Sequence, residues 1–236
     1  MQVEKKKFYE QYAICTLDVL LKGFSNFQKG ESPDYFNESV GLEITRAIST
    51  AEGEIDAFFT KYCNKFLTEI NQEQLKKLGF VEYPSSENGI YYQQRNKKND
   101  VLLYYKPKNT DDLLLCAHMN LLKPISSEDI RNAVDKKIKK LNSNYCVKPK
   151  NDLVLLVSEQ LNYICNKEYF VNKIVRTYIE QIKGIYDDEK YTLYFDNLYL
   201  IFWDNLFVID TKKWTLDQKT ISQENLNEIY SKLDEY

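Results

Sequence analysis

The pattern of hydrophobic and polar positions along the chain predicts helices that alternate with strands. Apolar residues recur at helical spacing in four segments, residues 3–22, 51–78, 127–142 and 168–182. Alternating or continuous apolar runs predict strands at residues 34–37, 40–47, 153–157, 198–203 and 206–210. The apolar run 113–119 fits a strand or a helix, and the tail 214–236 is polar and amphipathic at best. This order predicts an α/β fold with one central mixed sheet flanked by helices.

Residues 80–105 differ from the rest of the chain. Aromatic and β-branched residues predict three short strands joined by polar turns, at residues 80–83, 90–93 and 101–105. We interpret them as a small β insertion at about 80–120 in a single domain that spans residues 1–236. A chain of 236 residues that is 43% hydrophobic can bury the core of such a domain.

Composition and charge narrow the classes of partner. The net charge is −3, so no global positive field attracts nucleic acid, although a local basic patch remains compatible with binding. The five cysteines are odd in number and include no CxxC pair, which disfavours a zinc site or a disulfide framework. No apolar run reaches the roughly 20 residues that span a membrane, so we expect no membrane partner and a cytoplasmic location.

Two carboxylates stand out in and before the predicted strand 40–47. One face of this strand is apolar, with Val40, Leu42 and Ile44. The other face carries Gly41, Glu43 and Thr45, and Asp34 precedes the strand. A carboxylate among apolar neighbours is costly to bury unless it is paired or binds a metal. Two of them close together would suit Mg²⁺, whereas the alternative is a polar strand face at the margin of a sheet.

The predicted helix 127–142 places lysines on and beside its apolar stripe. At about 100° per residue, Lys137 falls inside the stripe that Ala133, Ile130, Val134 and Ile138 define, and Lys140 falls on its edge. A lysine in a buried stripe must extend its amine to solvent, pair with a carboxylate or belong to a site. Lys137 therefore either reaches solvent or points at Asp34 and Glu43 across the sheet edge.

Two of these segments resemble a known family. Residues 31–34, Glu-Ser-Pro-Asp, and residues 40–45, Val-Gly-Leu-Glu-Ile-Thr, resemble the PD-(D/E)XK nuclease superfamily. More narrowly, they resemble poorly characterised bacterial members that have a PD…ExT motif. Residues 130–141, Tyr145, residues 151–156 and residues 198–205 resemble the same group, and the insertion at about 80–120 has no counterpart there.

The resemblance implies a restriction-endonuclease-like αββαβ core and a set of site residues. Asp34 matches the first catalytic acid and Glu43 the second, and both would bind metal. Thr45 stands where the family usually has a lysine. Some members supply that lysine from a neighbouring helix, which makes Lys137 the candidate, with Lys140 beside it. An acid on the first helix is also common, and it corresponds to Glu10 or, as an alternative, Glu4.

The implied function is Mg²⁺-dependent or Mn²⁺-dependent hydrolysis of phosphodiesters in DNA. The metal would activate a water, Lys137 would stabilise negative charge, and Thr45 could hydrogen-bond the water. The alternative is a catalytically inactive protein of the same fold that acts as an interaction, immunity or accessory subunit with a protein partner. The missing strand lysine, the net negative charge and the aromatic insertion favour this alternative. The sequence predicts no oligomeric state.

Overall fold

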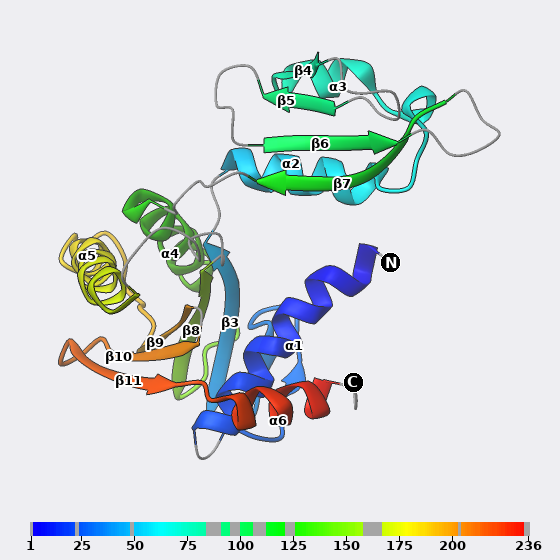
Figure 1. The fold of residues 1–236 in the computed structure, drawn as a ribbon. Helices are drawn as coiled ribbons and strands as arrows, with labels where there is room; N and C mark the ends of the chain where they lie inside the picture. The colour runs from blue at the N-terminus through cyan, green and yellow to red at the C-terminus, as the bar shows by residue number, and fades with distance from the viewer. Residues whose placement is uncertain are drawn as a thin grey trace. The chain divides into compact units, whose positions relative to one another are not determined.

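The computed structural model describes residues 2–21, 24–47, 50–83, 91–94, 100–105, 112–120, 126–157, 167–202 and 204–233. The chain divides into two compact units (Figure 1). The first comprises Met1–Ile48, Ile125–Glu159 and Cys165–Tyr236, and the second comprises Ser49–Pro124 and Gln160–Ile164. The second unit is thus wider than the insertion expected at about 80–120, because it also takes in the helical segment that precedes the strands.

A seven-stranded open sheet forms the centre of the first unit. Its strands are β1 (Gln28–Lys29), β2 (Tyr35–Phe36), β3 (Val40–Ala47), β8 (Lys150–Val157), β9 (Asn197–Phe202), β10 (Asn205–Asp210) and β11 (Thr215–Thr220). They lie in the order β1-β2-β3-β8-β9-β10-β11. The pairs β3–β8 and β8–β9 are parallel, and the other neighbouring pairs are antiparallel. The fold is therefore a mixed α/β architecture with a mostly antiparallel sheet.

The continuous apolar run 153–157 is the middle strand of this sheet. In β8 every residue after Lys150 is buried, because both faces of the strand are covered. The strands predicted at 198–203 and 206–210 correspond to β9 and β10, which pair antiparallel. Parallel central strands buried on both faces are typical of layered α/β folds, which explains why these strands read as unbroken apolar runs.

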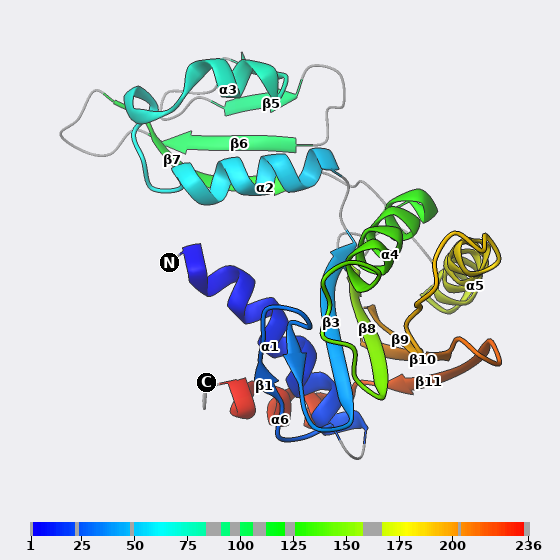
Figure 2. The same ribbon diagram turned by 180° about the vertical axis from the view of Figure 1, so that it is seen from behind.

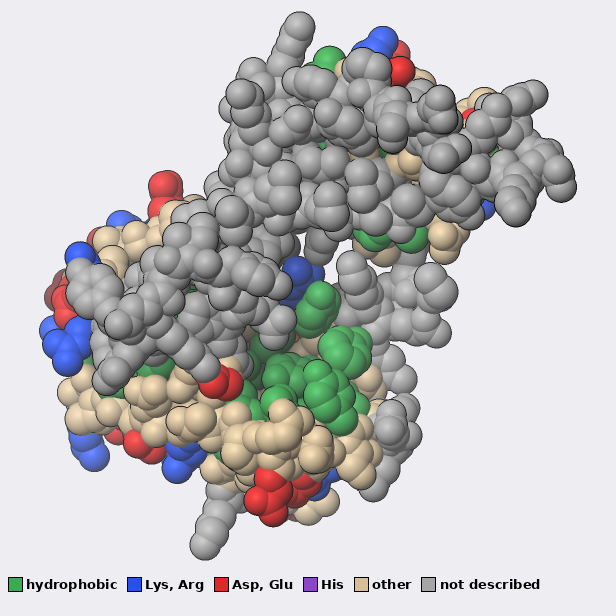
Figure 3. Space-filling view, viewed as in Figure 1, with side chains coloured by type: hydrophobic (Ala, Val, Ile, Leu, Met, Phe, Trp, Pro, Cys, Tyr) green, Lys and Arg blue, Asp and Glu red, His purple; other side chains and the backbone are tan. Residues whose placement is uncertain are grey.

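Helices cover both faces of the sheet. Helices α1 (Gln2–Leu20) and α6 (Gln223–Leu233) lie on one face, and α4 (Ser127–Leu141) and α5 (Lys167–Tyr186) lie on the other (Figures 1 and 2). Leu42 and Ile44 of β3 pack with Ala13 and Leu17 of α1 in one core cluster. Because side chains alternate along a strand, Glu43 lies on the opposite face, toward α4. Figure 3 shows hydrophobic side chains gathered over α1 on the face turned to the viewer.

Helix α4 begins at a capping box. The hydroxyl of Ser126 accepts a hydrogen bond from the N–H of Asp129, and the Asp129 carboxylate accepts one from the N–H of Ser126. The buried face of the helix then follows the expected stripe, Ile130, Val134, Ile138 and Leu141. Apolar burial on this stripe fixes the rotation of the helix, and with it the direction of the neighbouring lysines.

The second unit holds a four-stranded antiparallel sheet in the order β4-β5-β6-β7. Its strands are β4 (Phe80–Tyr83), β5 (Tyr91–Gln94), β6 (Asp100–Tyr105) and β7 (Leu114–Asn120). The apolar run 113–119, which fitted a strand or a helix, is therefore a strand. A separate core cluster joins this sheet to its helices through Ile55, Phe58, Leu75, Leu102 and Leu115.

The single helix predicted at 51–78 is wrong. The structure has α2 (Thr50–Tyr62), a 3₁₀ turn (Leu67–Glu69) and α3 (Gln72–Lys77). Asn64 adopts a left-handed conformation with φ 61°, and the N–H of Leu67 donates to the carbonyl of Leu113 at 2.7 Å. Backbone pairing with the start of β7 thus interrupts the helix, although the apolar residues continue at helical spacing.

The polar tail also contains more structure than its pattern indicates. β11 is an edge strand whose side chains are nearly all exposed, so it lacks apolar alternation, and pairing with β10 defines it. α6 buries Ile229 against the α1 face. Within the described residues no helix has the length and apolar character needed to cross a membrane.

Candidate functional site

The β2–β3 hairpin places Asp34 beside Glu43. Tyr35 pairs with Leu42 in this hairpin, Asp34 comes immediately before Tyr35, and Glu43 comes immediately after Leu42. Asp34 and Glu43 therefore lie opposite each other, one position farther from the turn than the Tyr35–Leu42 pair. A carboxylate oxygen of Asp34, Oδ2, accepts a hydrogen bond from the N–H of Ile44 at 2.8 Å, which fixes this side chain against β3.

The turn of the hairpin sets this register. Oδ1 of Asn37 accepts hydrogen bonds from the N–H groups of Ser39 at 3.0 Å and Val40 at 2.8 Å. The N–H of Asn37 donates to the carbonyl of Val40 at 3.0 Å. A shift of one residue would turn Glu43 to the opposite face of the sheet. The Asn-centred turn is therefore what keeps both acids on the α4 side.

Helix α4 brings two lysines to these acids. Nζ of Lys137 lies 3.1 Å from Oδ2 of Asp34 and also donates a short hydrogen bond to Oε2 of Glu43. Nζ of Lys140 lies 2.7 Å from Oε1 of Glu43 and 3.8 Å from Oδ1 of Asp34. It also donates to the carbonyl of Glu31 at 3.2 Å. The four side chains form a charge cluster of two anions and two cations, here called the acid–lysine cluster.

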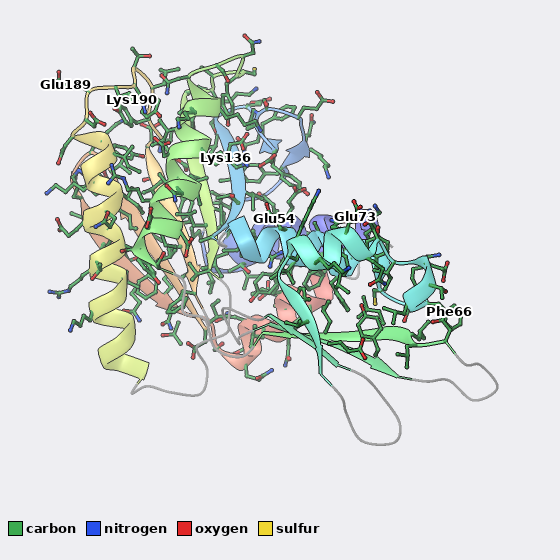
Figure 4. All side chains as sticks on the ribbon, turned by 90° about the horizontal axis from the view of Figure 1, so that it is seen from above. Glu54, Phe66, Glu73, Lys136, Glu189 and Lys190 are labelled. Carbon is green, nitrogen blue, oxygen red and sulfur yellow. The ribbon has the colours of Figure 1, made fainter. Side chains whose placement is uncertain are left out.

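The acid–lysine cluster becomes more exposed from Glu43 outward. The side chain of Glu43 is 0% exposed, those of Asp34 and Lys137 are 15% exposed, and that of Lys140 is 34% exposed. The preceding lysine, Lys136, is exposed on α4 and is labelled in Figure 4. Ions this far from water are tolerated only when they are paired, so the buried acids require the lysines.

Burial and charge pairing compete in this cluster. Burial acts to raise the pKa of Asp34, but Lys137 and the Ile44 hydrogen bond outweigh it and hold this pKa below its usual range. Burial of Glu43 prevails over the lysines and raises its pKa. Burial acts to lower the pKa of Lys137, yet Asp34 and Glu43 together raise it. Lys137 is therefore a permanent cation, and Glu43 is the acid whose charge is held less firmly.

A tyrosine that sequence reasoning did not assign to the site lies near these charges. The hydroxyl of Tyr145 is buried and has no hydrogen-bond partner among the described residues. Burial raises its pKa, and the charges of Glu43 and Asp34 raise it further. The family resemblance includes Tyr145 without giving it a role, and one tyrosine among nineteen has no other distinguishing pattern in the sequence.

The remaining predicted site residues lie outside the cluster. Thr45 is half-buried, two residues beyond Glu43 on the same face of β3. Glu10 is 7% exposed on α1, which covers the other face of the sheet, and it forms an ion pair with Lys29 at 3.4 Å. The side chain of Glu4 lies outside the described residues. The structure thus joins two predicted acids to two predicted lysines and pairs Glu10 elsewhere.

The donors suited to a metal in the acid–lysine cluster are two carboxylates. Within the ranges that the structure describes, no group of three or more His, Cys, Asp and Glu side chains is arranged to hold a metal ion. Mg²⁺ is commonly bound by one or two carboxylates, with water and substrate phosphate completing its six oxygen ligands. Asp34 and Glu43 meet that requirement by donor type once their contacts with the lysines loosen.

Comparisons of the chain with protein-family models, with curated proteins and with solved structures find no match. The assignment of this site therefore depends on its geometry and on the chemistry of its side chains.

Proposed function

We propose that this protein is a metal-dependent nuclease of the PD-(D/E)XK type with a restriction-endonuclease-like core. The observation that carries the proposal is the meeting of Asp34 and Glu43 with Lys137, which lies 103 residues after Asp34. The first unit also contains α1, β2, β3, α4 and β8 in chain order, which supports an αββαβ arrangement. Two acids and one lysine beside the β2–β3 hairpin are the groups that phosphodiester hydrolysis of this type requires.

In this proposal Asp34 and Glu43 hold Mg²⁺ or Mn²⁺. A bound divalent ion supplies charge stabilisation at the phosphate and lowers the pKa of its water. The hydrogen bond from Ile44 to Asp34 orients that carboxylate, and the apolar sheet around Glu43 keeps bulk water away from it. These two features give the acids fixed positions before a substrate arrives, which reduces the cost of ordering them.

In this proposal Lys137 performs the function of the lysine that is absent from β3, where Thr45 stands in its place. Its side chain is 15% exposed, and its charged amine is directed at both acids, so it can donate to a phosphate oxygen beside them. Donors positioned in advance where negative charge develops contribute strongly to catalysis. Lys140 is more exposed and can move away from Glu43 toward a phosphate at less cost.

A second candidate function has its own observation. Both carboxylate oxygens of Glu43 accept hydrogen bonds from lysine amines, so the cluster is already complete as a structural link between α4 and β3. A cluster of this kind can persist without catalysis and simply hold the helix in place. In that case the protein is a catalytically inactive member of the fold that binds a protein partner, as an immunity or accessory subunit does.

The test is cleavage of nucleic acid by the purified chain. Supercoiled plasmid, single-stranded DNA, duplex DNA and RNA are incubated with Mg²⁺, Mn²⁺ or EDTA. We expect metal-dependent cleavage that the double variant Asp34→Asn/Glu43→Gln abolishes. The matched control is Asp217→Asn, an acid on β11 whose side chain is 68% exposed, and it should cleave as the unaltered protein does.

Two results would contradict the proposal. Cleavage that persists unchanged in the double variant would assign the activity to another protein in the preparation. The absence of cleavage with every substrate, together with no Mn²⁺ binding in a calorimetric titration, would favour the inactive alternative. Binding of Mn²⁺ that the double variant loses and the Asp217→Asn variant keeps would support the assignment of the two acids, even where the correct substrate has not been found.

A further inference from the structure

A pocket of about 490 Å³ lies beside the turn of the β2–β3 hairpin. The lining includes the polar or charged residues Asn26, Gln28, Asn37, Glu38 and Lys148 and the aromatic residue Phe36. All of them belong to the first unit, as the acid–lysine cluster does. None of the four side chains of the acid–lysine cluster lines this pocket, so the pocket is a separate place for a ligand.

The pocket is on the same face of the sheet as the two acids. Phe36 lies two residues after Asp34, and its partner Gly41 lies two residues before Glu43, so side chains here point the same way. Two residues of a strand span about 7 Å. A Cβ at Gly41 would lie 3.1 Å from Cγ of Lys148, which shows that the lysine stem passes directly over the strand there. A ligand in the pocket would therefore adjoin the acids.

The side chains of the pocket match the chemistry of a nucleotide. Nζ of Lys148 lies 4.7 Å from the centre of the Phe36 ring, so a positive charge and an aromatic ring stand together. Unpaired bases stack on aromatic side chains, and lysine binds their phosphates. Side-chain amides such as those of Asn26 and Gln28 match the donors and acceptors on base edges. The turn uses Oδ1 of Asn37, so this residue offers a ligand its NH₂ group.

We propose that this pocket binds the base of an unpaired nucleotide next to the phosphodiester at the acid–lysine cluster. The base stacks on the Phe36 ring in place of the Lys148 amine that lies over it in this structure, and the displaced amine contacts the phosphate. A base in a pocket cannot be stacked in a duplex at the same time, so the substrate class is single-stranded nucleic acid or an unpaired end. This proposal extends the proposed nuclease function, but binding in the pocket requires neither metal nor cleavage.

The test is metal-free binding of a single strand. Fluorescein-labelled decathymidylate is titrated with protein in EDTA, and fluorescence anisotropy reports the Kd. We expect Phe36→Leu, which keeps an apolar side chain without an aromatic ring, to weaken binding about tenfold. Lys148→Gln should weaken it several-fold. The matched charge control is Lys213→Gln, 76% exposed beyond β10 at the far edge of the sheet, which should stay within about twofold of the unaltered protein.

An abasic strand of the same length separates base stacking from phosphate attraction. It should bind about tenfold more weakly than decathymidylate, and Phe36→Leu should not weaken it further. If Phe36→Leu fails to fold, as circular dichroism would show, Phe36→Trp replaces it. The tryptophan emission should then be quenched by decathymidylate and not by the abasic strand.

Equal affinity of Phe36→Leu and the unaltered protein for decathymidylate would overturn the proposal that this pocket binds a base. Equal affinity of the unaltered protein for decathymidylate and the abasic strand would overturn it too. No measurable binding of decathymidylate would overturn it as well. The variant Asp34→Asn/Glu43→Gln separates the two proposals. If it binds decathymidylate normally while no condition gives cleavage by the unaltered protein, the pocket stands and the nuclease function fails.

Discussion

Two buried carboxylates on neighbouring strands differ in the groups that stabilise them. Glu43 of β3 faces α4 and accepts hydrogen bonds from the amines of Lys137 and Lys140. Asp152 of β8 faces the α1 side and accepts from the backbone and side-chain N–H groups of Asn197 and the hydroxyl of Tyr199. Cations from a distant helix hold the first acid, whereas neutral groups of the adjacent strand hold the second.

The difference shows why burial of an acid does not by itself identify a functional site. Burial raises the pKa of both groups, and for Asp152 it reaches about 6. Asp152 is 1% exposed, and its donors belong to β9, so it links two strands inside the core. Glu43 has a second acid and two cations beside it, and the exposure of these partners increases toward solvent. The charge of the partners and their access to solvent favour Glu43 as the functional acid.

The largest expected effect concerns cleavage. Under the proposed function, Lys137→Met removes a charged donor from the phosphate, and the cleavage rate should fall about 100- to 1,000-fold. Asp152→Asn should leave the rate within about threefold, because Asp152 lies on the other face of the sheet. The measurement is the initial rate on the best substrate with saturating Mg²⁺. A fall of similar size in both variants would mean that fold stability, not the cluster, limits the activity.

The stability of the acid–lysine cluster gives the next effect. Lys137→Met leaves Asp34 and Glu43 buried with only Lys140 as a cation, and the free energy of unfolding should fall by about 3 kcal/mol. Urea denaturation followed by circular dichroism measures it. The matched variant is Lys140→Met, whose side chain is one-third exposed, and solvent screening should limit its loss to about 1 kcal/mol. A larger loss of unfolding free energy for Lys140→Met than for Lys137→Met would contradict the conclusion that Lys137 is the more buried partner of the two acids.

The last effect is the pH dependence that Asp152 gives to the free energy of unfolding. Folding raises its pKa from the ordinary 3.8 to about 6, so between these values the folded protein holds a proton that the unfolded chain releases. Its contribution to stability is therefore present below about pH 4 and is lost as pH rises to about 6, by at most about 3 kcal/mol. Asp152→Asn cannot titrate and should lack this loss.

Urea denaturation of the unaltered protein and of Asp152→Asn at several pH values between 4 and 7.5 tests the difference. The variant should gain stability relative to the unaltered protein as pH rises, because the other titrating groups are common to both. A difference that stays constant across this range would show that Asp152 keeps an ordinary pKa. It would also remove the contrast between the two buried acids.

Several helices and strands with strong apolar patterns were predicted correctly from the sequence. The unbroken apolar run Leu153–Val157 predicted a strand, and the stripe through Ile130 and Ile138 predicted α4, because burial of an element on one or both faces produces a periodic or continuous apolar pattern in the sequence. The break between α2 and α3 has no matching pattern in the sequence, because the break results from backbone pairing of Leu67 with Leu113. The exposed strand β11 was missed for the same reason.

The candidate site divides in the same way. The sequence alone determined that Glu43 lies on the polar face of β3 and that Lys137 lies inside the apolar stripe of α4, since both follow from the periods of strand and helix. Only the tertiary structure decided that the two meet, that Lys140 joins them and that Glu10 pairs with Lys29. Periodicity fixes which way a side chain points from its own element, whereas a contact across 94 residues depends on how the elements pack.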